Sequence, residues 1–273
     1  MIPAGFDYAR ASSLDEALSL LASAGEEAKV LAGGHSLLPL MKLRMATPSL
    51  LVDIARVRDL AYVREDGDAL AVGALTRHAD LGRDGTVARE APLLGRVAGQ
   101  IGDPQVRHRG TIGGSIVHGD PASDLPAACL ALGATFVLLG PGGERRVAAD
   151  DFFTGFLETA IGPDEILTEI RVPKAPGASF SFQKFNRRAQ DWAVVGCAVV
   201  RNGTTRVALV NMGPTPLRAA GAEEALGSGA GPAEAAERAS DGLSPPSDLN
   251  ASAEFRRHLA SVLVRRALEE AAG

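Results

Sequence analysis

The sequence predicts an α+β protein that contains more than one compact unit. Its first 55 residues alternate short helical and strand patterns, which predicts a small α/β unit. Two turn signals predict β-hairpins: Asn202-Gly203 separates two apolar runs, and the turn at 140–143 separates an apolar run at 136–139 from Arg145-Arg-Val. Residues 253–271 carry apolar side chains at helical spacing. A chain of 273 residues is long enough for one large or two modest domains.

The elements of the N-terminal unit follow from local signals. A capping box at residues 13–16 starts a helix, and Gly25 ends it. Residues 29–32 are short and apolar, so they predict a strand that leads directly into a pair of glycines. A helix over 37–45 and a strand over 50–54 are expected to complete this unit.

A larger mixed unit is expected over residues 56–175, and a C-terminal domain over 178–273. The larger unit has predicted strands at 68–75 and 166–172, helices at 93–101 and 124–132, a hairpin around 140–143, and a polar, glycine-rich segment at 102–121. Residues 173–177 are the expected linker. The C-terminal domain has predicted strands at 179–185, 193–200 and 206–212, and a last helix with its buried face at Phe255, Leu259, Val262 and Leu263.

Composition and charge exclude several classes of protein. The chain has 28 Lys and Arg against 33 Asp and Glu, and this net charge of −5 argues against a nucleic-acid partner. Its longest apolar stretch is shorter than the roughly 18 residues that a membrane span needs. Asp7, Arg10 and Asp15 stand where a signal peptide would need a basic start and an apolar centre. The expected location is the cytoplasm.

Cysteine usage excludes a cluster or structural zinc held by this chain alone. Cys129 and Cys197 lie inside apolar runs, where buried free thiols are expected, and no C-x-x-C pair occurs. The five histidines show no metal-ligand spacing. No metal site and no catalytic residue is therefore expected.

Two glycine-rich segments carry the strongest chemical signal. They are AGGHS at 32–36 and TIGGS at 111–115. Adjacent glycines let the backbone approach a ligand, and successive amides form an anion-binding nest to which hydroxyls add donors. Two such nests suit a pyrophosphate, although each Gly-Gly pair alone also fits a tight turn.

Other signatures of nucleotide binding and hydrolysis are missing from the sequence. It has no G-x-G-x-x-G after a strand, no G-x-x-x-x-G-K-[ST] and no G-x-S-x-G. The run GSGAG at 227–231 follows no strand and is interpreted as a connection between helices. A Rossmann dehydrogenase, a kinase and a serine hydrolase are thus disfavoured.

In combination, several segments resemble the medium, flavin-binding subunit of the molybdenum hydroxylases, the family of aerobic carbon monoxide dehydrogenase and xanthine dehydrogenase. The matching pieces are AGGHSLLPLMKLR at 32–44, LVDI at 51–54, GTIGGS at 110–115, DPASDLPA at 120–127, DWA at 191–193, GPTPLRA at 213–219 and EFRRHL at 254–259. They occur in family order along the chain.

The resemblance implies an FAD-binding fold of the vanillyl-alcohol-oxidase (PCMH) type with a C-terminal antiparallel sheet and helices. FAD would lie between the units 1–55 and 56–175, with its pyrophosphate held by the amides and hydroxyls of both glycine-rich segments. Ser115 stands where relatives often have Asn; the serine hydroxyl still provides a hydrogen-bond donor at this position. The residues implied in FAD binding are Lys29, Leu31, Ala32, Gly33, Gly34, His35, Ser36, Leu37, Gly110, Thr111, Gly114, Ser115 and Val117, with Ser123 and Asp124 at the nucleotide part, Leu167 and Lys184 on the flavin side, and Ile101 and Trp192 near the isoalloxazine ring.

The resemblance also implies a role for the chain. It would be the FAD subunit of an oxidoreductase and pass electrons from an iron–sulfur subunit to a small-molecule acceptor. Its partners would be a small [2Fe-2S] subunit and a large molybdopterin subunit, in a dimer of heterotrimers. Two alternatives stay open: a free-standing FAD-dependent oxidase or dehydrogenase, and a non-catalytic FAD-binding scaffold subunit. For Ile101 and Trp192, ordinary core packing is an equal alternative.

Overall fold

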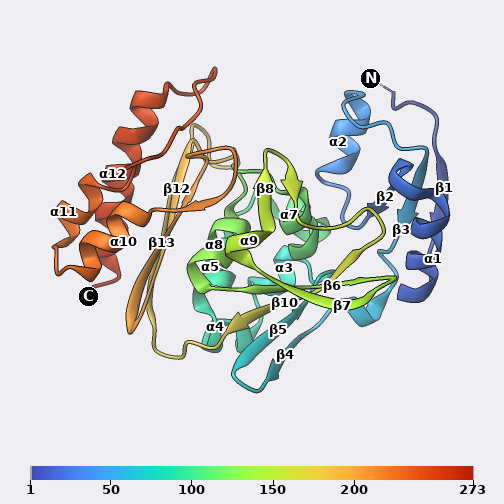
Figure 1. The fold of residues 1–273 in the computed structure, drawn as a ribbon, viewed down its shortest axis with the longest axis horizontal. Helices are drawn as coiled ribbons and strands as arrows, with labels where there is room; N and C mark the ends of the chain where they lie inside the picture. Colours follow the sequence, from blue (N-terminus) through green and yellow to red (C-terminus); the bar gives the residue numbers. More distant parts are fainter. Residues whose placement is uncertain (1, 273) are drawn as a thin grey trace.

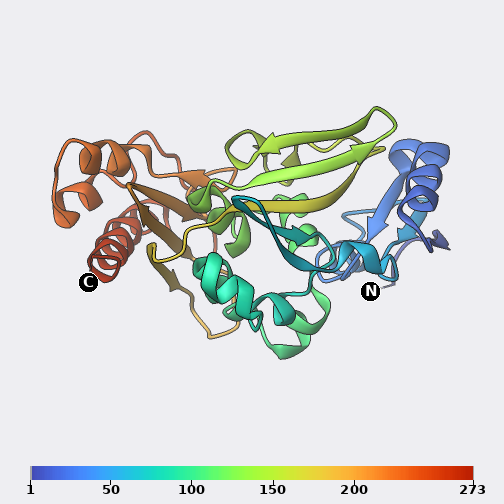
Figure 2. The ribbon, with the colours of Figure 1, turned by 90° about the horizontal axis from the view of Figure 1, so that it is seen from below.

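The chain is laid out in sequence order along the long axis of the molecule (Figure 1). The computed structural model describes residues 2–272. The N-terminal unit, drawn in blue, lies at one end and the orange and red C-terminal part at the other, with the green and yellow elements between them; a perpendicular view gives the same order (Figure 2). The helices and sheets confirm the α+β prediction.

A parallel three-stranded sheet with the order β1-β3-β2 forms the N-terminal unit. Its strands are β1 (Asp7–Arg10), β2 (Ala28–Leu31) and β3 (Leu50–Asp53), with α1 (Leu14–Ala24), α2 (Leu37–Lys42), η1 (Gly25–Glu27) and η2 (Arg58–Leu60) around them. The Ser13 hydroxyl caps α1 as predicted, but the Glu16 carboxylate accepts from the Ser12 amide. Helix α2 ends earlier than predicted, and Arg44 beyond it has φ 58°.

An antiparallel five-stranded sheet with the order β4-β5-β10-β6-β7 forms the middle of the molecule. Its strands are β4 (Val63–Asp66), β5 (Ala69–Gly73), β6 (Thr135–Gly140), β7 (Gly143–Ala148) and β10 (Ile166–Pro173), which confirms the predicted hairpin at 140–143. Around it lie α3 (His78–Leu81), α4 (Gly85–Glu90), α5 (Pro92–Gly99), α6 (Pro104–Arg109), α7 (Ile112–His118), α8 (Asp124–Leu132), α9 (Ala149–Phe152), β8 (Phe153–Gly155) and β9 (Glu158–Thr159). Strand β4 and the helices α6 and α7 are absent from the predicted elements.

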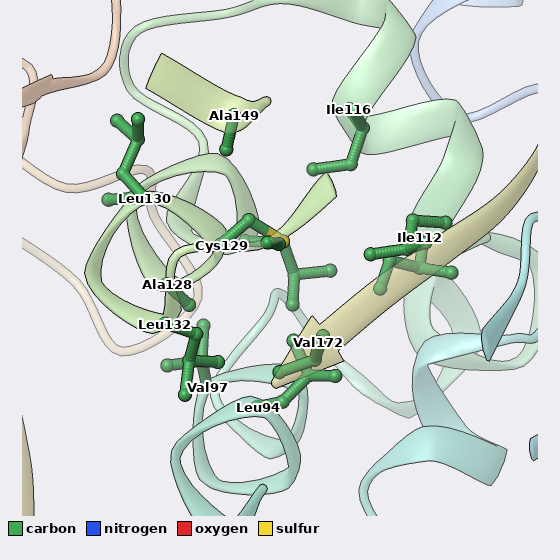
Figure 3. Close-up of a cluster of buried hydrophobic side chains, with 14 of the residues drawn as sticks. Leu94, Val97, Ile112, Ile116, Ala128, Cys129, Leu130, Leu132, Ala149 and Val172 are labelled. Carbon is green, nitrogen blue, oxygen red and sulfur yellow. The ribbon is translucent and has the colours of Figure 1, made fainter. Parts of the chain in front are cut away.

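Helices α7 and α8 pack on β10 of this sheet, and α5 packs on α8, so that the three helices close the main core. Figure 3 shows side chains of α5, α7 and α8 gathered around Cys129, close to Val172 of β10. Cys129 has no disulfide partner, and burial raises the pKa of its thiol to about 12. Cys197 lies in a separate core and is also buried, so the prediction of two buried free thiols is confirmed.

The C-terminal part consists of an antiparallel sheet and three helices. The sheet has the order β11 (Ser179–Phe185), β12 (Val195–Asn202), β13 (Thr204–Val210) and β14 (Leu217–Arg218), and the helices are α10 (Ala220–Gly227), α11 (Pro232–Glu237) and α12 (Ala253–Glu270). The sheet lies between α12 and α8 (Figure 1). The predicted hairpin is confirmed, with Gly203 at φ 71° between the paired Asn202 and Thr204.

The buried face of α12 differs from the prediction. Phe255 is 43% exposed, whereas its neighbour Arg256 is fully buried. Leu259 and Leu263 are buried as expected. The buried stripe is rotated toward Arg256 because its two terminal guanidinium nitrogens donate to the Val194 carbonyl and the Asp248 carboxylate, although Nε has no partner among the described residues.

No helix in residues 2–272 is long and apolar enough to cross a membrane.

Candidate functional site

The fold brings the first glycine-rich segment into backbone contact with residues 109 and 110, which directly precede the second segment. The first segment joins β2 to α2, and the second begins α7. A Cβ added to Gly33 would lie 2.9 Å from the Cα of Gly110 and closer still to the carbonyl oxygen of Arg109. Only glycine leaves room for this approach, so the backbone just before the second segment lies directly against the first.

A cavity of about 760 Å³ lies where the N-terminal unit meets the middle of the molecule. This volume is within the roughly 300–1,000 Å³ of small-molecule and cofactor sites. The wall contains most of the residues that the sequence predicts for FAD: Lys29, Leu31, Ala32, Gly33, Gly34, His35, Ser36, Leu37, Gly110, Thr111, Gly114, Ser115, Val117 and Leu167.

The first segment presents unpaired amides to this cavity. Within residues 2–272, the backbone N–H groups of 33–37 donate to no protein acceptor. The chain makes its first bonds into α2 only at the next residue, where the Leu38 N–H donates to the Gly34 carbonyl at 3.1 Å. Gly34 has φ +78°, which turns the backbone in a way that favours glycine. Consecutive free N–H groups of this kind form an anion-binding nest.

The second segment offers hydroxyls, because most of its amides already donate within the chain. The Ile112 and Gly113 amides donate to the carbonyls of Thr76 and Ala74 at 3.0 and 2.9 Å. The Gly114 amide donates to the Thr111 hydroxyl, and the Ser115 amide to the Thr111 carbonyl. The available donors therefore differ between the segments: the first has unpaired amides, and the second has mainly the hydroxyls of Thr111 and Ser115.

The remaining predicted residues lie outside the wall of this cavity. Ser123 is the N-cap residue of α8, and Asp124 at its first position forms a buried ion pair with Lys184 at 2.7 Å, the side chains being 5% and 8% exposed. Burial raises the pKa of Asp124, and the Lys184 ammonium opposes that shift. The Asp124 Oδ1 atom has no partner among the described residues. Ile101 is half-buried against the main core, which fits its packing alternative.

Trp192 lies in a second cavity between the middle and C-terminal parts of the molecule. It is 56% exposed, so the core-packing alternative is wrong for this residue. The cavity also has a volume of about 760 Å³, and its wall includes Asp120, Asn211 and the buried Arg256. The Arg256 guanidinium donates to the Val194 carbonyl, which fixes the backbone near Trp192.

Sequence reasoning missed His78, which lines the first cavity and is only 3% exposed. Its Nε2 atom lies 3.4 Å from the Ser115 Oγ. Burial lowers the pKa of His78 to about 4, with smaller contributions from His35 and Arg107, so the imidazole is neutral at pH 7. No sequence spacing links His78 to residue 115; only the meeting of α3 with α7 does. Several residues between 157 and 166 also line this cavity and were missed for the same reason, whereas Leu167 was predicted.

The residues present fit FAD. A dinucleotide needs donors for its pyrophosphate and apolar contacts along its length, and the wall supplies both from 33–37, Leu31, Val117 and Leu167. Among residues 2–272, no group of three or more His, Cys, Asp or Glu side chains forms a metal site.

Comparison with known proteins gives the family. Residues 4–175 match the family described as FAD binding domain in molybdopterin dehydrogenase, and residues 180–271 match the CO dehydrogenase flavoprotein C-terminal domain. The chain is 45% identical to the carbon monoxide dehydrogenase medium chain of Hydrogenophaga pseudoflava, over 99% of this chain and 98% of that protein. It is 39% identical to the alpha subunit of the 6-hydroxypseudooxynicotine dehydrogenase complex of Paenarthrobacter nicotinovorans, over 99% and 96%.

A solved structure agrees. Carbon monoxide dehydrogenase from Hydrogenophaga pseudoflava, in a form that lacks the Mo-pyranopterin moiety of the molybdenum cofactor, matches with a TM-score of 0.95 and 46% identity, covering 100% of this chain and 99% of that chain. The expected FAD-binding α+β fold is confirmed, and so is FAD as the cofactor. The chain belongs to the FAD-binding medium subunits of the molybdenum hydroxylases, a family of oxidoreductase subunits.

Proposed function

We propose that this chain binds FAD in the cavity between its N-terminal unit and its five-stranded sheet, and that it passes electrons from an iron–sulfur subunit to an external small-molecule acceptor. The observation that carries the proposal is the run of unpaired amides at 33–37 in the wall of a cavity of about 760 Å³. When bound, FAD supplies electron exchange in single or paired steps.

Each group in the wall has a proposed task. The amides of 33–37 and the hydroxyls of Ser36, Thr111 and Ser115 hold the pyrophosphate as neutral donors. Leu31, Val117 and Leu167 cover apolar parts of the cofactor and exclude water. The remaining wall positions proposed to contact FAD are Lys29, Ala32, Gly33, Gly34, His35, Leu37, Gly110 and Gly114.

Residues outside this wall are proposed to lie at the flavin end, which moves Ser123 and Asp124 from the nucleotide part expected from the resemblance, because Asp124 pairs directly with the flavin-side Lys184. Ser123 and the Asp124–Lys184 ion pair contact the cofactor at the start of α8, where the unpartnered Asp124 Oδ1 can accept one more hydrogen bond. Ile101 and Trp192 lie near the isoalloxazine ring, where an apolar or aromatic face tunes its electronics. The exposed indole of Trp192 supports this placement, since the chain itself does not cover it.

We propose that the partners are a small [2Fe-2S] subunit and a large molybdopterin subunit, in a dimer of heterotrimers located in the cytoplasm. Similarity over the whole chain to medium chains of dehydrogenase complexes supports such partners. Cys129 and Cys197 lie in two different buried cores, so they are not available as cluster ligands. Substrate oxidation then takes place on a partner chain.

The same proposal divides the chain into an FAD-binding domain, 1–175, and a C-terminal domain, 178–273. A core cluster that consists only of residues within 194–271 supports this division, while Phe182, Ala198 and Val210 pack into the core of the middle of the molecule.

Purification of the chain by itself tests the proposal against its alternatives. We expect the chain to bind one FAD per molecule and to oxidise no aldehyde, N-heterocycle or carbon monoxide without partner chains. A protein that takes up no flavin when FAD is added would refute the FAD role. Turnover of a substrate by the isolated chain would favour a free-standing oxidase or dehydrogenase, and a bound flavin that no partner or acceptor can reduce or oxidise would favour a scaffold role.

A further inference from the structure

His78 stands where the two glycine-rich segments meet. Its backbone N–H donates to the Gly110 carbonyl at 3.0 Å, and its ring packs directly against Gly110. A Cβ added to Gly110 would lie 2.7 Å from both Cδ2 and Nε2 of His78. The imidazole is therefore held in one position in the cavity wall, with only 3% of the residue exposed.

The two ring nitrogens have different surroundings. Nε2 lies 3.4 Å from the Ser115 hydroxyl, and Nδ1 is buried with no partner among the described residues. A neutral imidazole carries its proton on one nitrogen only. A buried N–H without an acceptor is rarer and more costly than an unused acceptor, so the proton belongs on Nε2. From there it donates to the Ser115 Oγ.

This tautomer determines what the serine can do. A hydroxyl has one proton and accepts through its lone pairs. When the Ser115 Oγ accepts from His78, its own proton is free to donate to a ligand, and the half-buried Ser115 lines the same cavity. If the proton were on Nδ1 instead, Ser115 would donate to Nε2 and would present only lone pairs to an anion.

We propose that His78 is a positioning residue that holds the Ser115 hydroxyl as a hydrogen-bond donor toward the pyrophosphate of FAD. This inference rests on the proposed function, because it requires FAD in this cavity. His78 itself does not contact the reacting atoms. It acts through Ser115, whose own backbone N–H is already bonded to the Thr111 carbonyl.

The test measures the dissociation constant of FAD for the full-length chain by quenching of flavin fluorescence. Glutamine carries an amide N–H at about the reach of Nε2, and asparagine carries one at about the reach of Nδ1. We expect Ser115→Ala and His78→Asn each to weaken FAD binding about tenfold, the loss of one hydrogen bond to a charged group. We expect His78→Gln to stay within about threefold of the wild type. His108→Asn, at an exposed histidine outside the cavity, is the matched control.

The double variant separates positioning from general packing. If His78 acts through Ser115, His78→Asn adds no further loss of affinity in the Ser115→Ala background. Any one of three results would overturn the inference. The first is a further tenfold loss of FAD affinity in the double variant, the second is a His78→Gln variant that binds FAD as weakly as His78→Asn does, and the third is a His78→Asn variant with wild-type FAD affinity. Melting temperatures of the apoproteins identify a variant that fails to fold. If His78→Asn does not fold, the FAD affinities of Ser115→Ala and His78→Gln decide the test. Absence of FAD binding by the wild-type chain would overturn the proposed function as well, so the two failures are distinguishable.

Discussion

Substitution of Gly33 by alanine tests the contact between the first glycine-rich segment and the backbone directly before the second. The added methyl group would meet backbone atoms of residues 109 and 110, with the Gly110 Cα at 2.9 Å, and backbone cannot move aside as a flexible side chain can. Overpacking of this kind costs about 1–3 kcal/mol. For a chain of this size, each kcal/mol of lost stability lowers the melting temperature by about 2–4 °C. A cost of about 2 kcal/mol should therefore lower the melting temperature by about 4–8 °C.

Gly114→Ala is the matched comparison. A Cβ at Gly114 would meet only the Thr111 hydroxyl, at 2.9 Å. Disturbing that N-cap bond lowers the stability by about 1 kcal/mol, and replacing glycine by alanine inside a helix raises it by about 1 kcal/mol. The apoprotein should therefore keep its melting temperature within about 2 °C. FAD affinity should still fall at least tenfold, because the exposed methyl group occupies cavity space that the cofactor needs.

Differential scanning fluorimetry of the apoproteins and FAD titration of each variant make the comparison. The expected pattern is loss of both stability and FAD affinity in Gly33→Ala, and loss of FAD affinity alone in Gly114→Ala. An apoprotein Gly33→Ala with wild-type stability would refute the backbone contact described here. A Gly114→Ala variant with wild-type FAD affinity would refute the placement of the cofactor along α7.

Three further predictions follow from single groups. Lys184→Met should lower stability by about 3–5 kcal/mol, because it leaves the Asp124 carboxylate buried without its partner; thermal melts should show this, and a Lys184→Met/Asp124→Leu double variant should recover part of the loss. Folding lowers the pKa of His78 from 6.5 to about 4, so the contribution of neutral His78 to the free energy of unfolding is full above pH 6.5 and is lost as the pH falls toward 4. The total loss should be about 3 kcal/mol. Denaturation measured across this pH range should detect it, and His78→Gln should remove this pH dependence. Trp192 is the only tryptophan in the sequence and is largely exposed, so tryptophan emission should decrease as FAD binds. Trp192→Phe should still bind FAD but change the rate at which the flavin is reduced. Unchanged tryptophan emission would place the flavin away from Trp192.

Local signals were sufficient where the residues that define an element are neighbours in sequence. The Ser13 cap, the turn at Gly203 and the hairpin at 140–143 each use residues a few positions apart, and all were predicted. Helices α6 and α7 were missed because their glycines and polar residues disfavour a helix locally. The structure stabilises them with side-chain caps from Asp103 and Thr111.

The site was predictable in composition but not in its division of tasks. Most residues named from the sequence do line one cavity. Which amides are free depends on long-range bonds, such as that from Gly113 to the Ala74 carbonyl, which no local pattern encodes. The burial of Arg256 and of His78 depends in the same way on distant partners, namely Val194 and Ser115.

Hydrogen exchange of the backbone amides at 33–37 tests the central claim most directly. These amides have no acceptor among residues 2–272, so in the apoprotein they should exchange about as fast as the amides of an unstructured peptide. Addition of FAD should protect this segment, whereas the paired strand 195–202 should show no change. Protection confined to the cavity around Trp192, or no protection at 33–37 at saturating FAD, would contradict the account.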